Sequence, residues 1–221
     1  MSNELAVVNS NQITESQPDP DAKNVINYNP IFPILMAQIN LDLPVTDMAE
    51  DLMSLANNTE NYSGGFTTYY TNQYIDGVRG ITDLKQAIYG VAAAYMKELK
   101  YDVNLEKCGI HLWANIMKKD GYHGHHRHER SVLSGTYYVQ TFEDSSPLII
   151  ENPTSMFRMH EPIVAKPEDY TAFTSPMLSL QPKPNTLFMW PSWLVHHVPS
   201  SKSSLPRISL SFNVDYLPKG A

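Results

Sequence analysis

The spacing of apolar residues changes near residue 100 and separates a helical region from a β-rich region. In 44–56 and 82–100, apolar residues recur every three or four positions, which predicts two helices, the first introduced by Pro44 and the second capped by Thr82. Elsewhere, short apolar runs bounded by Pro, Gly and Ser predict strands. The expected strands are 31–41, 109–117, 131–140, 147–151, 177–181, 185–193 and 207–214.

This pattern predicts a mainly β fold with flanking helices (α+β), of the jelly-roll or barrel type. Three strands in succession, from 109 to 151, are expected to be antiparallel. The tyrosine-rich segment 57–80 is either a plain surface loop or the wall of a pocket. Residues 153–176 show no periodicity and are expected to form a long excursion from the domain.

The composition predicts one globular domain behind an N-terminal arm. Residues 1–28 are rich in Asn, Ser, Gln, Asp and Pro, so we expect an arm that is disordered or extended. Residues 29–221 are long enough to bury a single core, and 42% of the whole chain is hydrophobic. We therefore expect one domain over 29–221.

Charge and cysteine content narrow the classes of partner and site. The net charge is −7 and no Lys/Arg-rich run is present, which disfavours nucleic acid as a partner. Cys108 is the only cysteine, so an internal disulfide and a thiolate metal site are excluded, and a buried thiol on a strand is expected. The N-terminus does not resemble a secretory signal, and no 18-residue apolar span occurs. We expect a cytoplasmic protein that does not enter membranes. The sequence leaves open whether the protein forms a homo-oligomer.

Histidines are concentrated in one short segment. Eight occur in the chain, and four of them lie within six residues, at positions 123, 125, 126 and 128. Residues at i and i+2 of an extended segment point to the same side, so either His-x-His pair can give two ligands to one metal ion. The alternative is a solvated polar loop that binds nothing.

A third ligand must come from elsewhere in the chain. His196 and His197 follow the expected strand 185–193 and are the first candidates, whereas His111 and His160 are weaker ones. His197 should point away from His196 on an extended chain, which favours a packed or supporting role.

The last expected strand alternates strictly between apolar and polar residues. Its polar positions are Arg207, Ser209, Ser211 and Asn213. An ordinary surface strand explains this pattern and is the commoner case. A strand whose polar face lines a ligand cavity between two sheets explains it as well.

Three motifs together resemble a known enzyme family. They are His126-Arg-His-Glu-Arg-Ser-Val-Leu-Ser-Gly-Thr-Tyr-Tyr138, Trp190-Pro-Ser-Trp-Leu-Val-His196 and Arg207-Ile-Ser-Leu-Ser-Phe-Asn213. Their order and separation resemble the small 2-oxoglutarate- and Fe(II)-dependent oxygenases of bacteria and phages, over about residues 30–215. This resemblance implies a double-stranded β-helix, which is a cupin-like jelly roll.

The resemblance also implies the site. His126, His128 and His196 would be the ligands of Fe(II). An arginine eleven residues after the last of these would pair with the distal carboxylate of 2-oxoglutarate, and the polar face of its strand would then look inward. The residues expected to bind 2-oxoglutarate are Arg207, Ser209, Asn115 and, less directly, Tyr138.

The implied activity is that of a dioxygenase. It would use O2 and 2-oxoglutarate, release succinate and CO2, and hydroxylate an unidentified substrate, which is a small molecule or a protein side chain. Non-haem Fe(II) oxygenases more often bind the metal with two histidines and one carboxylate. Glu129 and Glu151 are therefore the candidate carboxylate ligands if the three-histidine set is wrong.

Two alternatives stay open at this point. An open three-histidine site also suits Zn²⁺ and hydrolytic chemistry. The other alternative is a cupin-like protein that binds a metal or a small ligand without turnover, in which Arg207 would be a structural ion-pair residue.

The three tryptophans, Trp113, Trp190 and Trp193, are expected to serve in packing.

Overall fold

The computed structural model describes residues 32–71, 75–103 and 107–216. The chain divides into two compact units, residues 1–35 and 36–221, and every helix and strand described lies in the second unit. The expected arm, residues 1–28, lies outside the described residues. The predicted domain boundary therefore stays a prediction.

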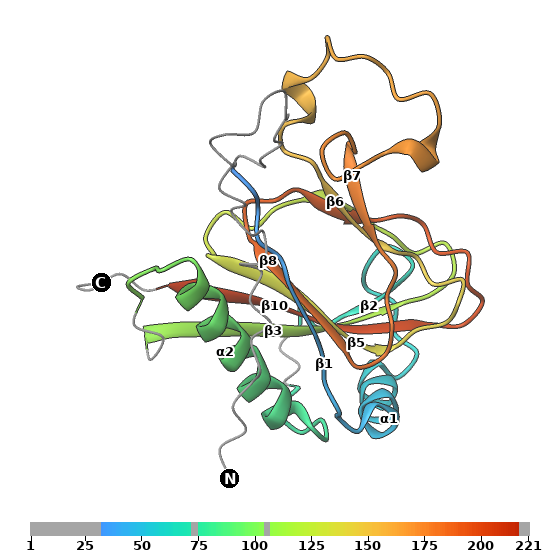
Figure 1. The fold of residues 1–221 in the computed structure, drawn as a ribbon. Helices are drawn as coiled ribbons and strands as arrows, with labels where there is room; N and C mark the ends of the chain where they lie inside the picture. Colours follow the sequence, from blue (N-terminus) through green and yellow to red (C-terminus); the bar gives the residue numbers. More distant parts are fainter. Residues whose placement is uncertain (1–31, 72–74, 104–106, 217–221) are drawn as a thin grey trace. The chain divides into compact units, whose positions relative to one another are not determined.

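Two antiparallel sheets face each other in the second unit (Figure 1). The larger sheet has the order β1-β8-β5-β10-β3-β2 and the smaller one has the order β4-β9-β6-β7. The strands of the larger sheet are β1 (Ala37–Asn40), β2 (Gly65–Thr67), β3 (Cys108–Met117), β5 (Leu133–Gln140), β8 (Thr186–Pro191) and β10 (Arg207–Tyr216). Those of the smaller sheet are β4 (His123–His126), β6 (Leu148–Glu151), β7 (Met177–Leu180) and β9 (His196–Val198).

This arrangement is the double-stranded β-helix, so the predicted fold class is confirmed. The chain alternates between the sheets, because β3, β5, β8 and β10 belong to the larger sheet while β4, β6, β7 and β9 belong to the smaller one. All strand pairs are antiparallel, but β3 and β5 are not neighbours: β10 lies between them, and β6 belongs to the opposite sheet. Succession along the chain therefore does not give adjacency in this fold.

Two helices cover the outer face of the larger sheet (Figure 1). Helix α1 (Val45–Ala56) follows Pro44 as predicted and buries Met48, Leu52 and Ala56. Helix α2 (Ile81–Glu98) begins two residues earlier than an N-cap at Thr82 predicts. Its N-cap is Gly80 at φ 78° and no side chain caps it, so the assignment of the cap to Thr82 was wrong. The chain enters α2 through a left-handed conformation, which glycine adopts without steric cost.

The central strand β10 is buried on both faces. Its apolar residues Ile208, Leu210, Phe212 and Val214 are at most 1% exposed, and its polar residues Arg207, Ser209 and Asn213 are also buried. The helices cover one face of the sheet and the smaller sheet covers the other. The interpretation of this segment as an ordinary surface strand is therefore wrong, and its polar face looks into the space between the sheets.

An apolar cluster fills part of the space between the two sheets. Its buried members are Met117, Tyr138, Leu148, Ile150, Phe188, Trp190, Leu194 and Val198. Burial of side chains of this size contributes about 1.5–3 kcal/mol each. The cluster fixes the sheets against each other on one side of the polar cavity described below.

The remaining expectations concern single features. Cys108 is buried at the start of β3, and burial raises the pKa of its thiol, as expected for an inert core residue. The segment 152–176 contains only the short 3-10 helices η3 (Ser155–Phe157) and η4 (Pro167–Asp169) and is largely exposed. Within the described residues, no helix is long and apolar enough to cross a membrane.

Candidate metal centre

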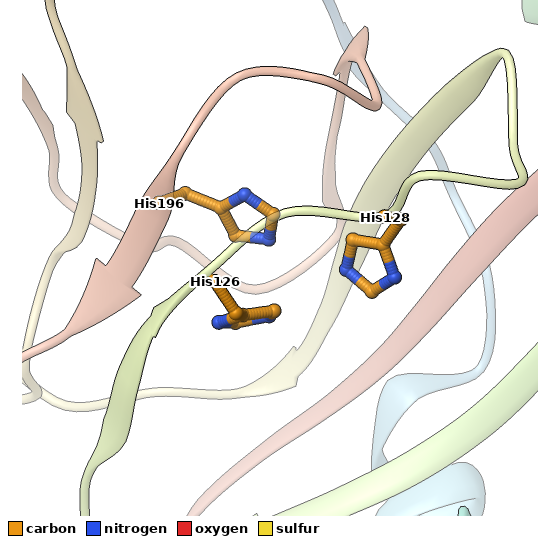
Figure 2. Close-up of side chains that lie close together, drawn as sticks. All are labelled: His126, His128 and His196. Carbon is orange, nitrogen blue, oxygen red and sulfur yellow. The ribbon is translucent and has the colours of Figure 1, made fainter.

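Three histidines converge at the open side of the space between the sheets. His126 ends β4, His128 follows two residues later, and His196 begins β9. One ring nitrogen of each lies within 4.8 Å of those of the other two. Figure 2 shows the three rings gathered around a common space. The structure thus brings together the three residues that the sequence analysis named as ligands.

Backbone pairing holds these residues in place. His126 lies opposite His196 in the antiparallel pairing of β4 with β9, and their ring centroids are 4.3 Å apart. The backbone N–H of His128 donates to the carbonyl of Ser192 at 2.9 Å, which ties the segment after β4 to the turn before β9. Both links are set by main-chain geometry, so the cluster does not depend on flexible side-chain contacts.

Two of the imidazoles have a defined tautomer. Nδ1 of His126 lies 2.7 Å from the carbonyl oxygen of Gly124, and Nδ1 of His196 lies 2.9 Å from that of Leu194. A carbonyl oxygen can only accept, so Nδ1–H donates in each case and, in the neutral ring, the lone pair is on Nε2. Such an outer hydrogen bond orients an imidazole for coordination.

Burial keeps His196 and His128 uncharged at neutral pH. Burial, followed by the nearby charge of His126, lowers the pKa of His196 to about 3 and that of His128 to about 4. Burial and the charge of Arg207 lower the pKa of His123 to about 3. Neutral imidazoles with free lone pairs are the form that binds metal ions.

Arg207 is a buried cation next to this cluster. It is 3% exposed, and in the part of the chain that the structure describes no carboxylate forms an ion pair with it. Its Nη1 lies 3.4 Å from Oγ of Ser209, its Nη2 lies 3.3 Å from the hydroxyl of Tyr138, and its Nε has no hydrogen-bond partner. A buried guanidinium with only two long contacts is poorly compensated, because burying charge is costly unless the charge is paired.

The histidine cluster and Arg207 line one cavity of about 360 Å³. Ser209 and Asn115 line it as well, from paired positions on β10 and β3. Tyr138 does not belong to the lining; it is fully buried beneath Arg207, whose guanidinium carbon is 4.9 Å from the centre of its ring. Its place is thus behind the arginine rather than in the cavity wall.

Aromatic residues form the opposite wall of the cavity. Tyr62, Tyr69, Tyr70 and Trp113 line it, and Tyr69 contacts both Tyr70 and Trp113 with ring centroids 5.0 Å apart. Within the segment 57–80, the stretch 62–70 therefore contributes to a pocket wall and is not a plain surface loop, whereas Tyr74 lies outside the described residues. Trp113 was expected only to pack, and its position on β3, two residues from Asn115, is the signal that could have placed it in the cavity.

The other candidate ligands lie away from the cluster. Glu129 pairs with Arg127 on the surface at 2.8 Å, and Glu151 contacts His125 and His197 instead of the three-histidine cluster. His197 points away from His196, as predicted. The remaining histidines are not part of the cluster. His123 lines the cavity, His111 packs against Trp113, and His160 is exposed. Trp193 is also exposed.

Fold and site together define a double-stranded β-helix protein with a cluster of three histidines whose ring nitrogens are close enough together to hold one metal ion. Residues 111–213 match the model of a family described as "Putative 2OG-Fe(II) oxygenase". The matched segment contains all three motifs on which the resemblance was based. The resemblance to the 2-oxoglutarate- and Fe(II)-dependent oxygenases is therefore confirmed, and the expected cofactors Fe(II) and 2-oxoglutarate are the ones in that family's description.

Several solved structures share this fold. A prolyl-4-hydroxylase from Pseudomonas putida is 13% identical with a TM-score of 0.56, covering 83% of this chain and 93% of its own. HygX from Streptomyces hygroscopicus, solved with nickel and 2-oxoglutarate bound, is 8% identical with a TM-score of 0.55 and 83% of both chains covered. The 2-oxoglutarate-dependent carbocyclase SnoK from nogalamycin biosynthesis is 10% identical with a TM-score of 0.55, covering 82% of this chain and 79% of its own.

At these identities the likeness establishes the fold alone. The three neighbours are a hydroxylase, a carbocyclase and a protein solved with nickel, so the fold does not specify the reaction outcome. A comparison with curated proteins gives no match.

Proposed function

We propose that this protein is an Fe(II)- and 2-oxoglutarate-dependent dioxygenase that hydroxylates an unidentified substrate and releases succinate and CO2. The observation that carries the proposal is the buried Arg207, without a carboxylate partner among the described residues, in the same cavity as the three clustered histidines. A three-histidine metal site alone would fit many functions. A three-histidine metal site beside the buried, unpaired guanidinium of Arg207 fits a small anion that binds both the metal ion and the guanidinium.

The histidine cluster fits Fe(II). His126, His128 and His196 would hold the ion on one side through neutral nitrogens and leave its other positions to 2-oxoglutarate and O2. When bound, Fe(II) supplies the redox chemistry that activates O2. Three imidazoles bring no negative charge, and the distal carboxylate of 2-oxoglutarate would pair with Arg207, so the other carboxylate of 2-oxoglutarate would offset one of the two charges of the ion.

Arg207 fits the distal carboxylate of 2-oxoglutarate. A guanidinium offers two parallel N–H donors that match a carboxylate, and the low dielectric of a buried site strengthens the pair. Ser209 projects from the same face of β10 and its hydroxyl can donate to the same group. Tyr138 supports the guanidinium from below through its ring and hydroxyl. Asn115 would contact the co-substrate from β3, held by the bond from its Nδ2 to Oγ of Ser211 at 3.0 Å.

The substrate would bind between the metal and the aromatic wall. The cavity volume of about 360 Å³ is modest, so it suits 2-oxoglutarate plus a small molecule or one protein side chain. The net charge of −7 speaks against nucleic acid. The cytoplasmic location and the choice between monomer and homo-oligomer stay predictions.

The first experiment tests the ternary site without turnover. Anaerobic addition of Fe(II) and 2-oxoglutarate to tag-free protein should give a metal-to-ligand charge-transfer band in the green part of the visible spectrum. Arg207→Ala should lose the band at the same 2-oxoglutarate concentration, whereas the exposed Arg130→Ala should retain it. A zinc hydrolase or a non-catalytic binder of another ligand gives no such band.

The second experiment tests the reaction. In air, the wild-type protein should convert 2-oxoglutarate to succinate slowly, and the rate should rise when a substrate from a metabolite or peptide library is added. Oxygen incorporation into that substrate, followed by mass spectrometry with ¹⁸O2, distinguishes hydroxylation from other oxidative outcomes. Absence of both the band and any succinate would overturn the proposal.

A further inference from the structure

A second group of metal-binding side chains lies on the opposite face of the smaller sheet. It consists of His125, Glu151 and His197, whose ligand atoms all lie within 4.8 Å of one another. His125 is adjacent in sequence to His126, and His197 is adjacent to His196. Successive residues of a strand point to opposite faces, so two neighbouring pairs of histidines supply one cluster on each face of the sheet.

The three residues come from three strands that lie side by side. Strand β9 is central and pairs with β4 on one edge and with β6 on the other. Each strand thus contributes one side chain to the same outer patch. The arrangement depends on the register of two separate strand pairs, and a hydrogen-bonded sheet holds that register firmly.

The distances in this group suit a small divalent ion. Nε2 of His125 lies 3.0 Å from Oε1 of Glu151, and Nδ1 of His197 lies 3.4 Å from the same oxygen. In a tetrahedral Zn²⁺ site with bonds of about 2.0–2.1 Å, the ligand atoms are roughly 3.3–3.4 Å apart. The side chains are therefore close to a coordinating arrangement without any change of fold.

Two observations distinguish the group from an ordinary surface ion pair. Nδ1 of His197 is buried and has no hydrogen-bond partner, although it lies 3.4 Å from Oε1 of Glu151. The ring centroids of His125 and His197 are 3.9 Å apart, and both rings lie beside the same carboxylate oxygen of Glu151. An ion pair needs only one histidine, while a metal ion uses both.

We propose that His125, Glu151 and His197 form a second divalent transition-metal site, for which Zn²⁺ is the best-matched ion. Two nitrogens and one carboxylate oxygen are typical donors for Zn²⁺, and the exposed side of the patch leaves room for a water as fourth ligand. The side chain of His125 is 62% exposed, so the ion enters from solvent.

The bound ion would cross-link β4, β9 and β6. Strands β4 and β9 also carry His126 and His196, so the ion would stiffen the frame of the three-histidine cluster. A ligand that binds only the folded state stabilises it by mass action. At about 100 times its dissociation constant, Zn²⁺ at this site should raise the melting temperature by roughly 5–10 °C.

The test is Zn²⁺ titration of tag-free, chelator-treated protein by calorimetry, with bound metal counted by elemental analysis. Wild-type protein should bind two ions per chain, one at each cluster. Glu151→Gln and His125→Ala should each weaken one of the two sites by at least about 100-fold, since loss of an outer-shell partner alone costs 10–100-fold. Both residues are partly or fully exposed, so the variants should fold; circular dichroism checks this.

Matched variants make the result specific. Glu129→Gln and His160→Ala remove a surface carboxylate and a surface histidine elsewhere and should leave both ions bound. His128→Ala should remove only the ion of the three-histidine cluster. Two ions retained in Glu151→Gln and in His125→Ala, or a wild-type protein whose only ion is lost in His128→Ala, would overturn the second site. A single ion lost in Glu151→Gln but not in His128→Ala would support it and contradict the cofactor site instead.

Discussion

His126 of β4 and His196 of β9 face each other across an antiparallel strand pair, with ring centroids 4.3 Å apart. Seventy residues separate them in the sequence, so the pairing of two short strands in the smaller sheet creates the metal cluster. A slip of one residue in either strand would exchange a histidine of the cluster for its neighbour on the opposite face of the sheet. The register of this pair therefore decides which histidines share the cavity.

The first prediction concerns the ligands. His126→Ala or His128→Ala should abolish Fe(II) binding at concentrations that saturate the wild-type protein, because two imidazoles remain where three are needed. His123→Ala should bind Fe(II) within a few-fold of wild type, since His123 lines the cavity outside the cluster. Anaerobic equilibrium dialysis with metal analysis measures both. Equal loss in His123→Ala and His128→Ala would show that the ligand set is misassigned.

The second prediction concerns the buried cation. Arg207→Met should weaken 2-oxoglutarate binding by roughly 100-fold or more, because about 1.5–3 kcal/mol is lost for each charge-assisted hydrogen bond. The same change should raise the melting temperature of the apo-protein, since an uncompensated buried charge is replaced by an apolar chain of similar length. Differential scanning fluorimetry with and without 2-oxoglutarate reads both effects.

A control separates the two effects. Arg130→Met should change neither the melting temperature nor the stabilisation by 2-oxoglutarate, since Arg130 is exposed. If Arg207→Met instead unfolds the apo-protein, Arg207 has a structural role that the long contacts to Ser209 and Tyr138 do not indicate.

The sequence predicted those parts of the site that local patterns encode. The i, i+2 spacing of His126 and His128 and the strict alternation of β10 are both visible in the sequence, and the structure confirms that the polar face of β10 lines a cavity. Alternation could not decide whether that face met solvent or a second sheet, because both environments favour polar residues. The resemblance to a family decided it.

Features that depend on long-range pairing were not predictable. The sequence gives no sign that β10 separates β3 from β5, or that Glu151 of β6 would meet His125 and His197. The wrong cap at Thr82 has a local cause: a threonine near a helix start resembles an N-cap, but the left-handed Gly80 before it already starts the helix.

The third prediction concerns acid stability. His123, His128 and His196 have folded-state pKa values of about 3, 4 and 3, below their value of about 6.5 in the unfolded chain. Below pH 6.5 the unfolded state therefore binds more protons than the folded state, so stability rises with pH. The stability that these groups contribute is complete above about pH 6.5 and is lost as pH falls toward 4. The apo-protein should melt at a clearly lower temperature at about pH 5 than at about pH 7.5.

His123→Asn isolates one group in this comparison. Asparagine does not titrate, so the variant should lose less stability between these two pH values than the wild-type protein, while it still binds Fe(II) at neutral pH. Most carboxylates titrate below this window, which limits their contribution. A wild-type melting temperature that does not change between the two pH values would contradict the assigned burial of these imidazoles.

The fourth prediction concerns packing behind the cavity. Gly135 lies on β5, where an added Cβ would collide with the ring of Phe212 and with the carbonyl oxygen of Phe188. Phe212 is fully buried and the carbonyl belongs to the paired strand β8, so neither can easily move. Gly135→Ala should cost roughly 1–3 kcal/mol of unfolding free energy. Urea denaturation followed by circular dichroism measures this cost.

Gly109 provides the matched comparison for that variant. It lies on β3, and an added Cβ would meet nothing within 4 Å. Gly109→Ala should therefore leave stability unchanged or raise it by a few tenths of a kcal/mol, since alanine restricts the unfolded chain more than glycine does. Because Gly135 also lines the cavity, its variant should bind 2-oxoglutarate more weakly, and Gly109→Ala should bind it normally. Equal stability of the two variants would mean that β5 and β10 can separate enough to admit a methyl group, and that the sheet beneath Arg207 is less rigid than its packing indicates.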